Sequence, residues 1–166
     1  MKEFAALYPK DKKECYALLH AQLTALLEGE TELIPNLANT SALLGQALEN
    51  INWVGFYLMK KGELLLGPFQ GKPACIHIPI GKGVCGTAVA ENRTLLVEDV
   101  HAFPGHIACD SASRSEIVVP IHWKGRVVGV LDIDSPIQSR FDEEDRLGLE
   151  KLVQSLEVGC IWEADE

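Results

Sequence analysis

Cysteines carry the most reactive chemistry that this sequence offers. Of the five, Cys15 and Cys160 fall on apolar positions of predicted helices, where they are expected to be buried core thiols. Cys75, Cys85 and Cys109 cluster in the middle of the chain instead. Cys109 lies in an irregular stretch, residues 98–114, with no periodic pattern to bury it. An accessible loop thiol suits a nucleophile, so we expect Cys109 to be reactive.

Cys85 stands in a glycine-rich turn, residues 81–87, that leads into a short predicted helix. Free backbone N–H groups at such a turn, near Gly83 and Cys85, can hold a carboxylate and can lower the pKa of a thiol. The turn lacks the spacing of a nucleotide phosphate loop, which argues against nucleotide binding.

Metal binding is the competing use of the same side chains. No Cys-x-x-Cys pair occurs, and Cys75-x-His77 is not a usual zinc motif. We therefore expect no metal and treat His101, His106 and His122 as loop or surface residues.

Acidic residues gather on one face of the predicted sheet. Side chains alternate along a strand, so Trp53 and Tyr57 share one face, and Asp132 and Asp134 share one face of the strand at residues 126–134. In other proteins, such an Asp pair more often ends a strand in water. Here the acids coincide with aromatic residues and a cysteine, which favours a site.

The preceding strand, residues 115–122, forms a hairpin with residues 126–134. A three-residue loop at residues 123–125 pairs His122 with Arg126 and sets Glu116 directly opposite Asp132. Glu116, Asp132 and Asp134 then converge. Like charges beside an apolar wall raise carboxyl pKa values, so one acid is expected to stay protonated near neutral pH.

Apolar periodicity predicts the elements that position these residues. Helices are expected at about residues 11–29, 35–48 and 142–161, with Asp11 and Asp142 at their N-termini, and further strands at residues 53–59, 63–69, 74–80 and 94–97. By alternation, Cys75 and His77 are assigned to the pocket face of the strand at residues 74–80. The order predicts one α+β domain over residues 1–166, with a largely antiparallel sheet, terminal helices on one face and a ligand pocket on the other.

Charge and hydropathy exclude several classes of protein. Fifteen basic against 24 acidic residues give a net charge of −9, which argues against binding nucleic acid or an anionic membrane. No signal peptide or membrane span is predicted, so we expect a cytoplasmic protein with reduced thiols.

The sequence resembles the free methionine-(R)-sulfoxide reductases, enzymes with a GAF fold. The resemblance covers nearly the whole chain. It rests on residues 52–57 (NWVGFY), 67–75 (GPFQGKPAC), 81–88 (GKGVCGTA), 106–110 (HIACD), 113–120 (SRSEIVVP) and 129–136 (GVLDIDSP).

The resemblance implies roles for the three central cysteines. Cys109 attacks the sulfoxide sulfur and becomes a sulfenic acid, Cys75 condenses with it to a disulfide, and Cys85 is an auxiliary resolving thiol. Thioredoxin reduces the disulfide, no other cofactor is needed, and the chain forms a homodimer.

The same resemblance explains the remaining residues. Glu116 would protonate the sulfoxide oxygen, and Asp132 and Asp134 would bind the substrate ammonium. Trp53 and Tyr57 would surround the S-methyl group, while backbone near Gly83 would meet the carboxylate. A pocket that encloses a zwitterionic amino acid on all sides leaves no exit for a polypeptide, so the implied substrate is free methionine sulfoxide. The preference for the R epimer is implied by the resemblance alone.

Two other functions fit the same residues. A GAF-type sensor would bind a small metabolite without turnover, but it needs neither three thiols nor three acids. A thiol peroxidase would use the same nucleophile and leave the acids unexplained.

Overall fold

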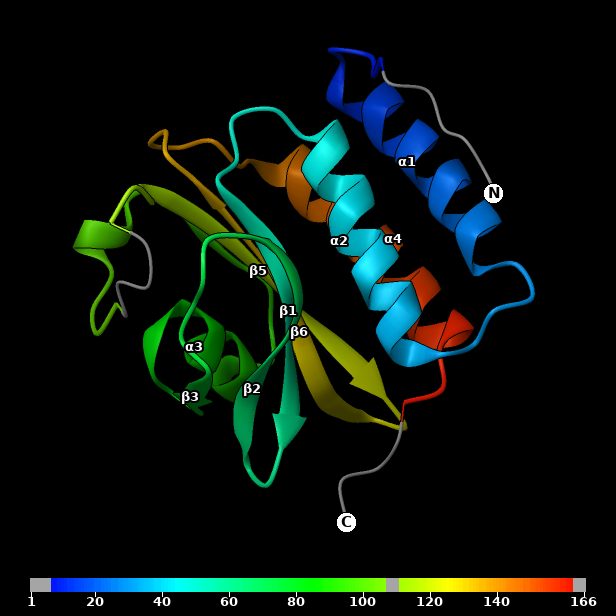
Figure 1. Ribbon diagram of the computed structural model, residues 1–166. Helices are drawn as coiled ribbons and strands as arrows, with labels where there is room; N and C mark the ends of the chain where they lie inside the picture. Colours follow the sequence, from blue (N-terminus) through cyan, green and yellow to red (C-terminus); the bar gives the residue numbers. More distant parts are fainter. Residues whose placement is uncertain (1–6, 107–110, 163–166) are drawn as a thin grey trace.

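A single six-stranded sheet, antiparallel throughout, organises the protein. The computed structural model describes residues 7–106 and 111–162 (Figure 1). The strand order is β3-β2-β1-β6-β5-β4. The strands are β1 (Trp53–Lys60), β2 (Glu63–Gly71), β3 (His77–Pro79), β4 (Leu95–Val97), β5 (Ser115–Trp123) and β6 (Arg126–Ser135).

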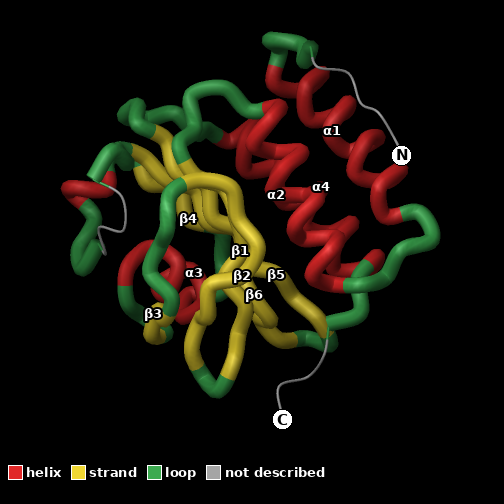
Figure 2. The backbone as a smooth tube through the Cα atoms, viewed as in Figure 1, coloured by secondary structure: helices red, strands yellow, loops and turns green. Residues whose placement is uncertain are grey.

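Three helices cover one face of this sheet, as the sequence predicted. They are α1 (Lys12–Leu27), α2 (Leu33–Ala47) and α4 (Glu143–Gly159), and Figures 1 and 2 show them together on one side of the strands. Buried side chains such as Leu19, Phe56 and Leu131 form the core between the two layers. The opposite face carries α3 (Gly83–Glu91) and the short 3-10 helix η1 (Val100–Ala102), over a second apolar cluster. The predicted α+β architecture is confirmed.

The predicted helix N-caps are also confirmed. The Asp11 side chain accepts a hydrogen bond from the backbone N–H of Glu14, and Asp142 begins α4 with a full capping box. These bonds satisfy backbone donors that have no partner within the helix.

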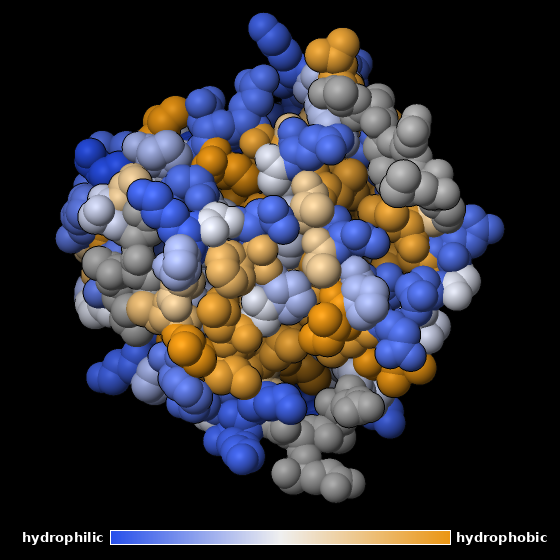
Figure 3. Space-filling view, in the orientation of Figure 1, coloured by the Kyte–Doolittle hydropathy of each residue, from blue (hydrophilic) through white to orange (hydrophobic). Residues whose placement is uncertain are grey.

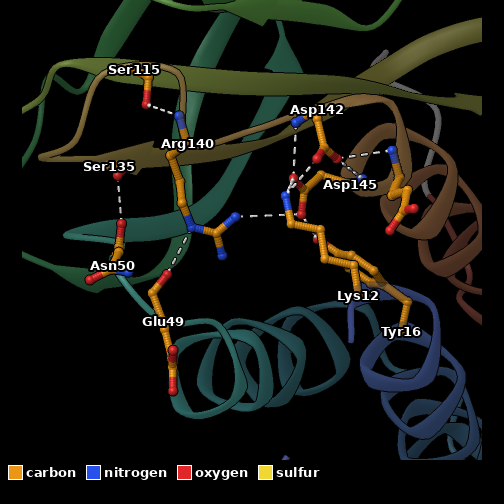
Figure 4. Close-up of polar contacts among 10 residues, drawn as sticks. Lys12, Tyr16, Glu49, Asn50, Ser115, Ser135, Arg140, Asp142 and Asp145 are labelled. Carbon is orange, nitrogen blue, oxygen red and sulfur yellow. Dashed lines mark hydrogen bonds and ion pairs between the residues drawn. The ribbon is translucent and has the colours of Figure 1, made fainter. Parts of the chain in front are cut away.

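A buried ionic network around Asp145 joins α1 to α4 and to the segment that precedes α4 (Figure 4). Asp145 is 1% exposed and accepts hydrogen bonds from Lys12 Nζ at 2.7 Å and from Tyr16 Oη at 2.7 Å. Arg140 lies 3.5 Å from the same carboxylate, and its Nε donates to the carbonyl oxygen of Glu49. A buried carboxylate is tolerated only with such partners, so the network specifies how the helical layer meets the end of β6.

The β5–β6 hairpin corrects the predicted register. The loop has two residues, Lys124 and Gly125, and Trp123 pairs with Arg126. Both loop residues have positive φ angles, 50° and 77°, which a two-residue turn requires and which matches the twist of the strands. A register shift between Ile121 and His122 then adds one residue on β6.

A two-residue loop alone would have placed Glu116 on the face opposite to Asp132 and Asp134. The register shift moves the pairing by one further position and returns Glu116 to their face. Glu116 consequently pairs with Asp134, and Val118, not Glu116, pairs with Asp132. The predicted partner of Glu116 was wrong, but the three carboxylates still share one face because the pairing changed by an even number of positions.

Two further predictions about exposure were wrong. Of the strand predicted at residues 74–80, only β3 forms. Ile78 packs in the apolar cluster on the pocket side, whereas His77 is exposed and pairs with Glu63. The three residues of β3 do alternate, but with Ile78 and not His77 on the pocket side, because this edge strand pairs with β2 over these three residues and the rest of the predicted strand is irregular. On α4, Leu147 is 59% exposed although it fits the apolar pattern.

Among the described residues, no helix combines the length and the apolar character needed to cross a membrane.

Candidate active site

A pocket lies between the sheet and α3, on the face that the sequence assigned to ligand binding. The space between its walls is about 550 Å³ when the open solvent at its mouth is included. It is lined by Trp53, Tyr57, Lys72, Pro73, Ala74, Ile78, Lys82, Gly83, Val84, Cys85, His106, Ser113, Glu116, Asp132 and Asp134.

Three carboxylates meet at the floor of this pocket. Glu116 comes from β5, and Asp132 and Asp134 come from the adjacent strand β6. Glu116 is 6% and Asp132 5% exposed, so water screens them poorly. The structure thus brings together the three acids that strand alternation had placed on one face.

Burial and mutual repulsion determine the protonation of these acids. Removal from water raises the pKa of Glu116 well above its usual range, and the charges of Asp132 and Asp134 raise it further. Burial also raises the pKa of Asp132, although hydrogen bonds from Glu116 and Cys85 oppose the rise. Of these two acids, Glu116 is the one whose pKa burial and neighbouring charges both raise, which is the direction that a proton donor requires.

Cys85 belongs to the same cluster, but its electrostatics differ from the prediction. It lies in the first turn of α3 and is 4% exposed. Burial raises the pKa of its thiol, and the charges of Asp132, Glu116 and Asp134 add to the rise. Desolvation and three nearby carboxylates outweigh the favourable end of a nine-residue helix, so the expected lowering of this pKa was wrong.

Aromatic rings form one wall of the pocket and hold the segment that carries Cys75. Trp53 stacks on Tyr57 and on Phe69, with ring centroids 5.9 Å and 5.1 Å apart. The Tyr57 hydroxyl donates to the carbonyl oxygen of Cys75 at 3.0 Å, and Trp53 Nε1 donates to that of Lys72 at 3.1 Å. The rings thereby position the backbone of residues 72–75 beside the pocket.

The cysteines differ in redox state. Cys75 is half-buried and disulfide-bonded, whereas Cys15, Cys85 and Cys160 are buried free thiols. The predicted nucleophile, Cys109, lies outside the described residues. Cys15 and Cys160 belong to the helical core, as predicted.

The glycine-rich turn lies at the pocket, as its sequence suggested. Gly83 begins α3 with a φ of 61°, in the left-handed region that favours glycine, and it lines the pocket. A Cβ at Gly86 would lie 2.4 Å from the carbonyl oxygen of Pro79, so only glycine lets α3 approach the end of β3.

Sequence reasoning missed several residues of the pocket. His106, treated as a loop residue, places Nε2 4.0 Å from Glu116 Oε1, and burial lowers its pKa. Ser113 accepts a hydrogen bond from the Asn52 amide at 3.1 Å, and Lys72 and Lys82 also line the pocket. These residues lie in loops, where neither alternation nor helical periodicity predicts direction. The signal that could have indicated them is the set of motifs that carry the family resemblance, which includes all four residues.

Comparison with known proteins places the chain in a family. Residues 22–159 match the GAF domain model. The chain is 57% identical over 147 residues to the free methionine-R-sulfoxide reductase of Escherichia coli strain K12, covering 89% of each protein. It superposes on the fRMsr of Staphylococcus aureus in complex with substrate with a TM-score of 0.84 and 58% identity, covering 87% of this chain and 94% of that one.

A free methionine-R-sulfoxide reductase from Neisseria meningitidis, solved in complex with its substrate, gives a TM-score of 0.89 with 47% identity over 94% of this chain and 95% of its own. Fold and pocket define the chain as a GAF domain protein, with its ligand site on the sheet face opposite the terminal helices. Within that class it belongs to the free methionine-R-sulfoxide reductase family, whose members are oxidoreductases.

Proposed function

We propose that this protein reduces free L-methionine-(R)-sulfoxide to L-methionine. The observation that carries the proposal is the buried cluster of Glu116, Asp132 and Asp134 in a pocket walled by Trp53 and Tyr57. A raised carboxyl pKa supplies a proton donor for the sulfoxide oxygen, and the neighbouring acids suit a substrate ammonium group.

The proposed chemistry begins at Cys109. Its thiolate attacks the sulfoxide sulfur while Glu116 protonates the oxygen, so that a bond forms between the two sulfur atoms. The hydroxyl oxygen then transfers to the Cys109 sulfur, the bonds from methionine sulfur to oxygen and to Cys109 break, and methionine leaves with two more electrons while Cys109 becomes a sulfenic acid. The Cys75 thiol then attacks the sulfenic sulfur, so that a disulfide forms and water departs. The disulfide-bonded state of Cys75 supports a resolving role for this thiol.

The remaining assignments belong to the same proposal. Gly83 and the first turn of α3 would meet the substrate carboxylate, and Cys85 would be an auxiliary thiol whose raised pKa makes it slow to react. Thioredoxin would donate two electrons to the disulfide in the cytoplasm. The enzyme would need no metal or organic cofactor and would form a homodimer.

A coupled assay tests this proposal. The protein is supplied with thioredoxin, thioredoxin reductase and NADPH, and then with the R or the S epimer of free L-methionine sulfoxide. We expect NADPH oxidation with the R epimer alone, and its loss in Cys109→Ser but not in the matched core variant Cys160→Ser. Folded protein that oxidises no NADPH yet binds either epimer would favour a GAF-type sensor, and turnover by the Cys109→Ser variant would transfer the nucleophile to another thiol.

A further inference from the structure

We propose that the pocket also binds a divalent cation of the zinc type, held by Cys85, Glu116 and Asp132, and that this cation inhibits the protein. One donor atom from each side chain, the Cys85 Sγ and one oxygen of each carboxylate, lies within 4.8 Å of the other two. All three residues are buried. The sequence predicted no metal because no spacing of cysteines and histidines matched a zinc motif, and the ion proposed here is an inhibitor, not a resident cofactor.

The donor set selects the kind of ion. Zinc binds thiolate sulfur and carboxylate oxygen at about 2.0–2.3 Å, which sets the donors of a tetrahedral site roughly 3.4–3.7 Å apart. Donors at the 4.8 Å limit would have to close by about 1.1–1.4 Å to reach that spacing, which rotation of the three side chains would have to supply. These three side chains leave the fourth position of a tetrahedral ion to a water molecule. A thiolate disfavours magnesium and calcium, which prefer oxygen ligands alone.

An unsatisfied buried atom points independently to a ligand. Asp132 is 5% exposed and lines the pocket, and its Oδ1 has no hydrogen-bond partner among the described residues. A buried carboxylate oxygen without a donor is costly, and a bound cation would satisfy it. Over the same described ranges, neither Glu116 nor Asp132 has an ion pair with a lysine or an arginine, and the basic side chain near Glu116 is His106, whose Nε2 lies 4.0 Å from Oε1.

Binding involves no change of oxidation state. The metal takes the place of the Cys85 thiol proton and of any proton on the carboxyl groups; these protons leave to solvent, and a metal–sulfur bond forms. The ion would then occupy the place that the proposed function gives to the substrate ammonium and sulfoxide groups. Inhibition that free substrate relieves is therefore expected, and this one consequence rests on the proposed function.

Cobalt is the spectroscopic probe for the site, because Co²⁺ takes zinc sites and absorbs strongly when bound by thiolate. The protein is used in its disulfide state, so that Cys75 cannot bind metal and the free thiols include Cys15, Cys85 and Cys160. Cys15 and Cys160 are buried in the helical core on the other side of the sheet. Titration with Co²⁺ should give a saturable thiolate-to-cobalt charge-transfer band, which Zn²⁺ abolishes by displacement.

Two variants assign the band to these ligands. Cys85→Ser should remove it, Asp132→Asn should weaken Co²⁺ binding at least tenfold, and the core variant Cys160→Ser should keep it. Circular dichroism checks that each variant is folded. No saturable band at millimolar Co²⁺, or a band that survives in folded Cys85→Ser, overturns the site.

The Zn²⁺ concentration that halves NADPH-coupled turnover should match the Zn²⁺ dissociation constant, and it should increase as the concentration of methionine sulfoxide is raised. Binding of Zn²⁺ without inhibition would overturn the inhibitory role. The cobalt titration needs no turnover. A protein that binds Co²⁺ but reduces no sulfoxide refutes the proposed function alone, and an active enzyme without the band refutes the metal site alone.

Discussion

Replacing Glu116 by glutamine isolates the proton that the proposed mechanism needs. Glutamine keeps the shape of the side chain but has no acidic proton, in a position that is only 6% exposed. General acid catalysis contributes typically about 10²–10⁴-fold, so the chemical step should slow by that factor, or about 2.7–5.4 kcal/mol of transition-state stabilisation. Substrate affinity should change much less, because Asp132 and Asp134 remain to bind the ammonium group.

The assay must observe the chemical step itself. Reduced protein in excess is mixed with L-methionine-(R)-sulfoxide, quenched at intervals and analysed for methionine, so that reduction by thioredoxin does not limit the rate. Glu63→Gln is the matched control, because Glu63 lies outside the pocket and pairs with the exposed His77 at 2.6 Å. Its single-turnover rate should equal that of the unaltered protein.

The dependence of this rate on pH gives a second readout. A general acid works only while protonated, so the rate should fall as pH rises through the raised pKa of Glu116. Glu116→Gln should lack this descending limb. If the Glu116→Gln rate falls by no more than about threefold, the loss is far smaller than a general acid should cause, and the reasoning is refuted. It is also refuted if the pH profile of Glu116→Gln keeps its descending limb.

Stability should change with pH in a related way. The folded-state pKa of Glu116 is raised above its usual value of 4.5, so its protonated form contributes stability that is fully present below about pH 4.5. This contribution is lost as pH rises toward the raised folded-state pKa. Glutamine does not ionise, so the free energy of unfolding of Glu116→Gln should fall less over this window than that of the unaltered protein. Chemical denaturation at several pH values measures the difference, and equal slopes would contradict it.

Four further substitutions test other parts of the structure. Cys75→Ser should release about one methionine per active site and then stall when thioredoxin is the only reductant; sustained turnover would exclude Cys75 as the resolving thiol. Gly55→Ala would place a Cβ 2.2 Å from the Phe69 Cβ and should cost at least about 2 kcal/mol of unfolding free energy. Gly45→Ala in α2, whose Cβ would meet nothing closer than 3.6 Å, should change stability by no more than about 1 kcal/mol, toward greater stability. Equal effects of the two glycine variants would contradict the packing described. Asp145→Ala breaks the buried network and should destabilise the protein by about 3–5 kcal/mol in denaturant titration; a loss below about 1 kcal/mol would show that its partners reach water instead.

Patterns with a fixed period were predictable from the sequence. The apolar stripes and the acidic N-caps predicted α1 and α4, because a helix repeats every 3.6 residues and its first N–H groups need acceptors. Alternation along β1 and β6 placed Trp53, Tyr57 and Asp132 on one face, where the structure also has them.

Distances and directions in the site required the tertiary structure. The β5–β6 pairing depended on a two-residue turn and a register shift, and only the folded hairpin distinguishes this combination from a three-residue loop. Burial of the Cys85 thiol, and then the charges of three carboxylates from β5 and β6, raise its pKa and so reverse the change that its helical position favours. His106 reaches Glu116 from a loop, where no periodicity exists.

The sequence by itself therefore determined which residues share a face, because the periods of helices and strands are properties of the local backbone. Tertiary structure decided which of them touch, how deeply they are buried and which acid keeps its proton. Those properties depend on desolvation and on distances between segments far apart in the chain, as the approach of Cys85 to Glu116 and Asp132 illustrates.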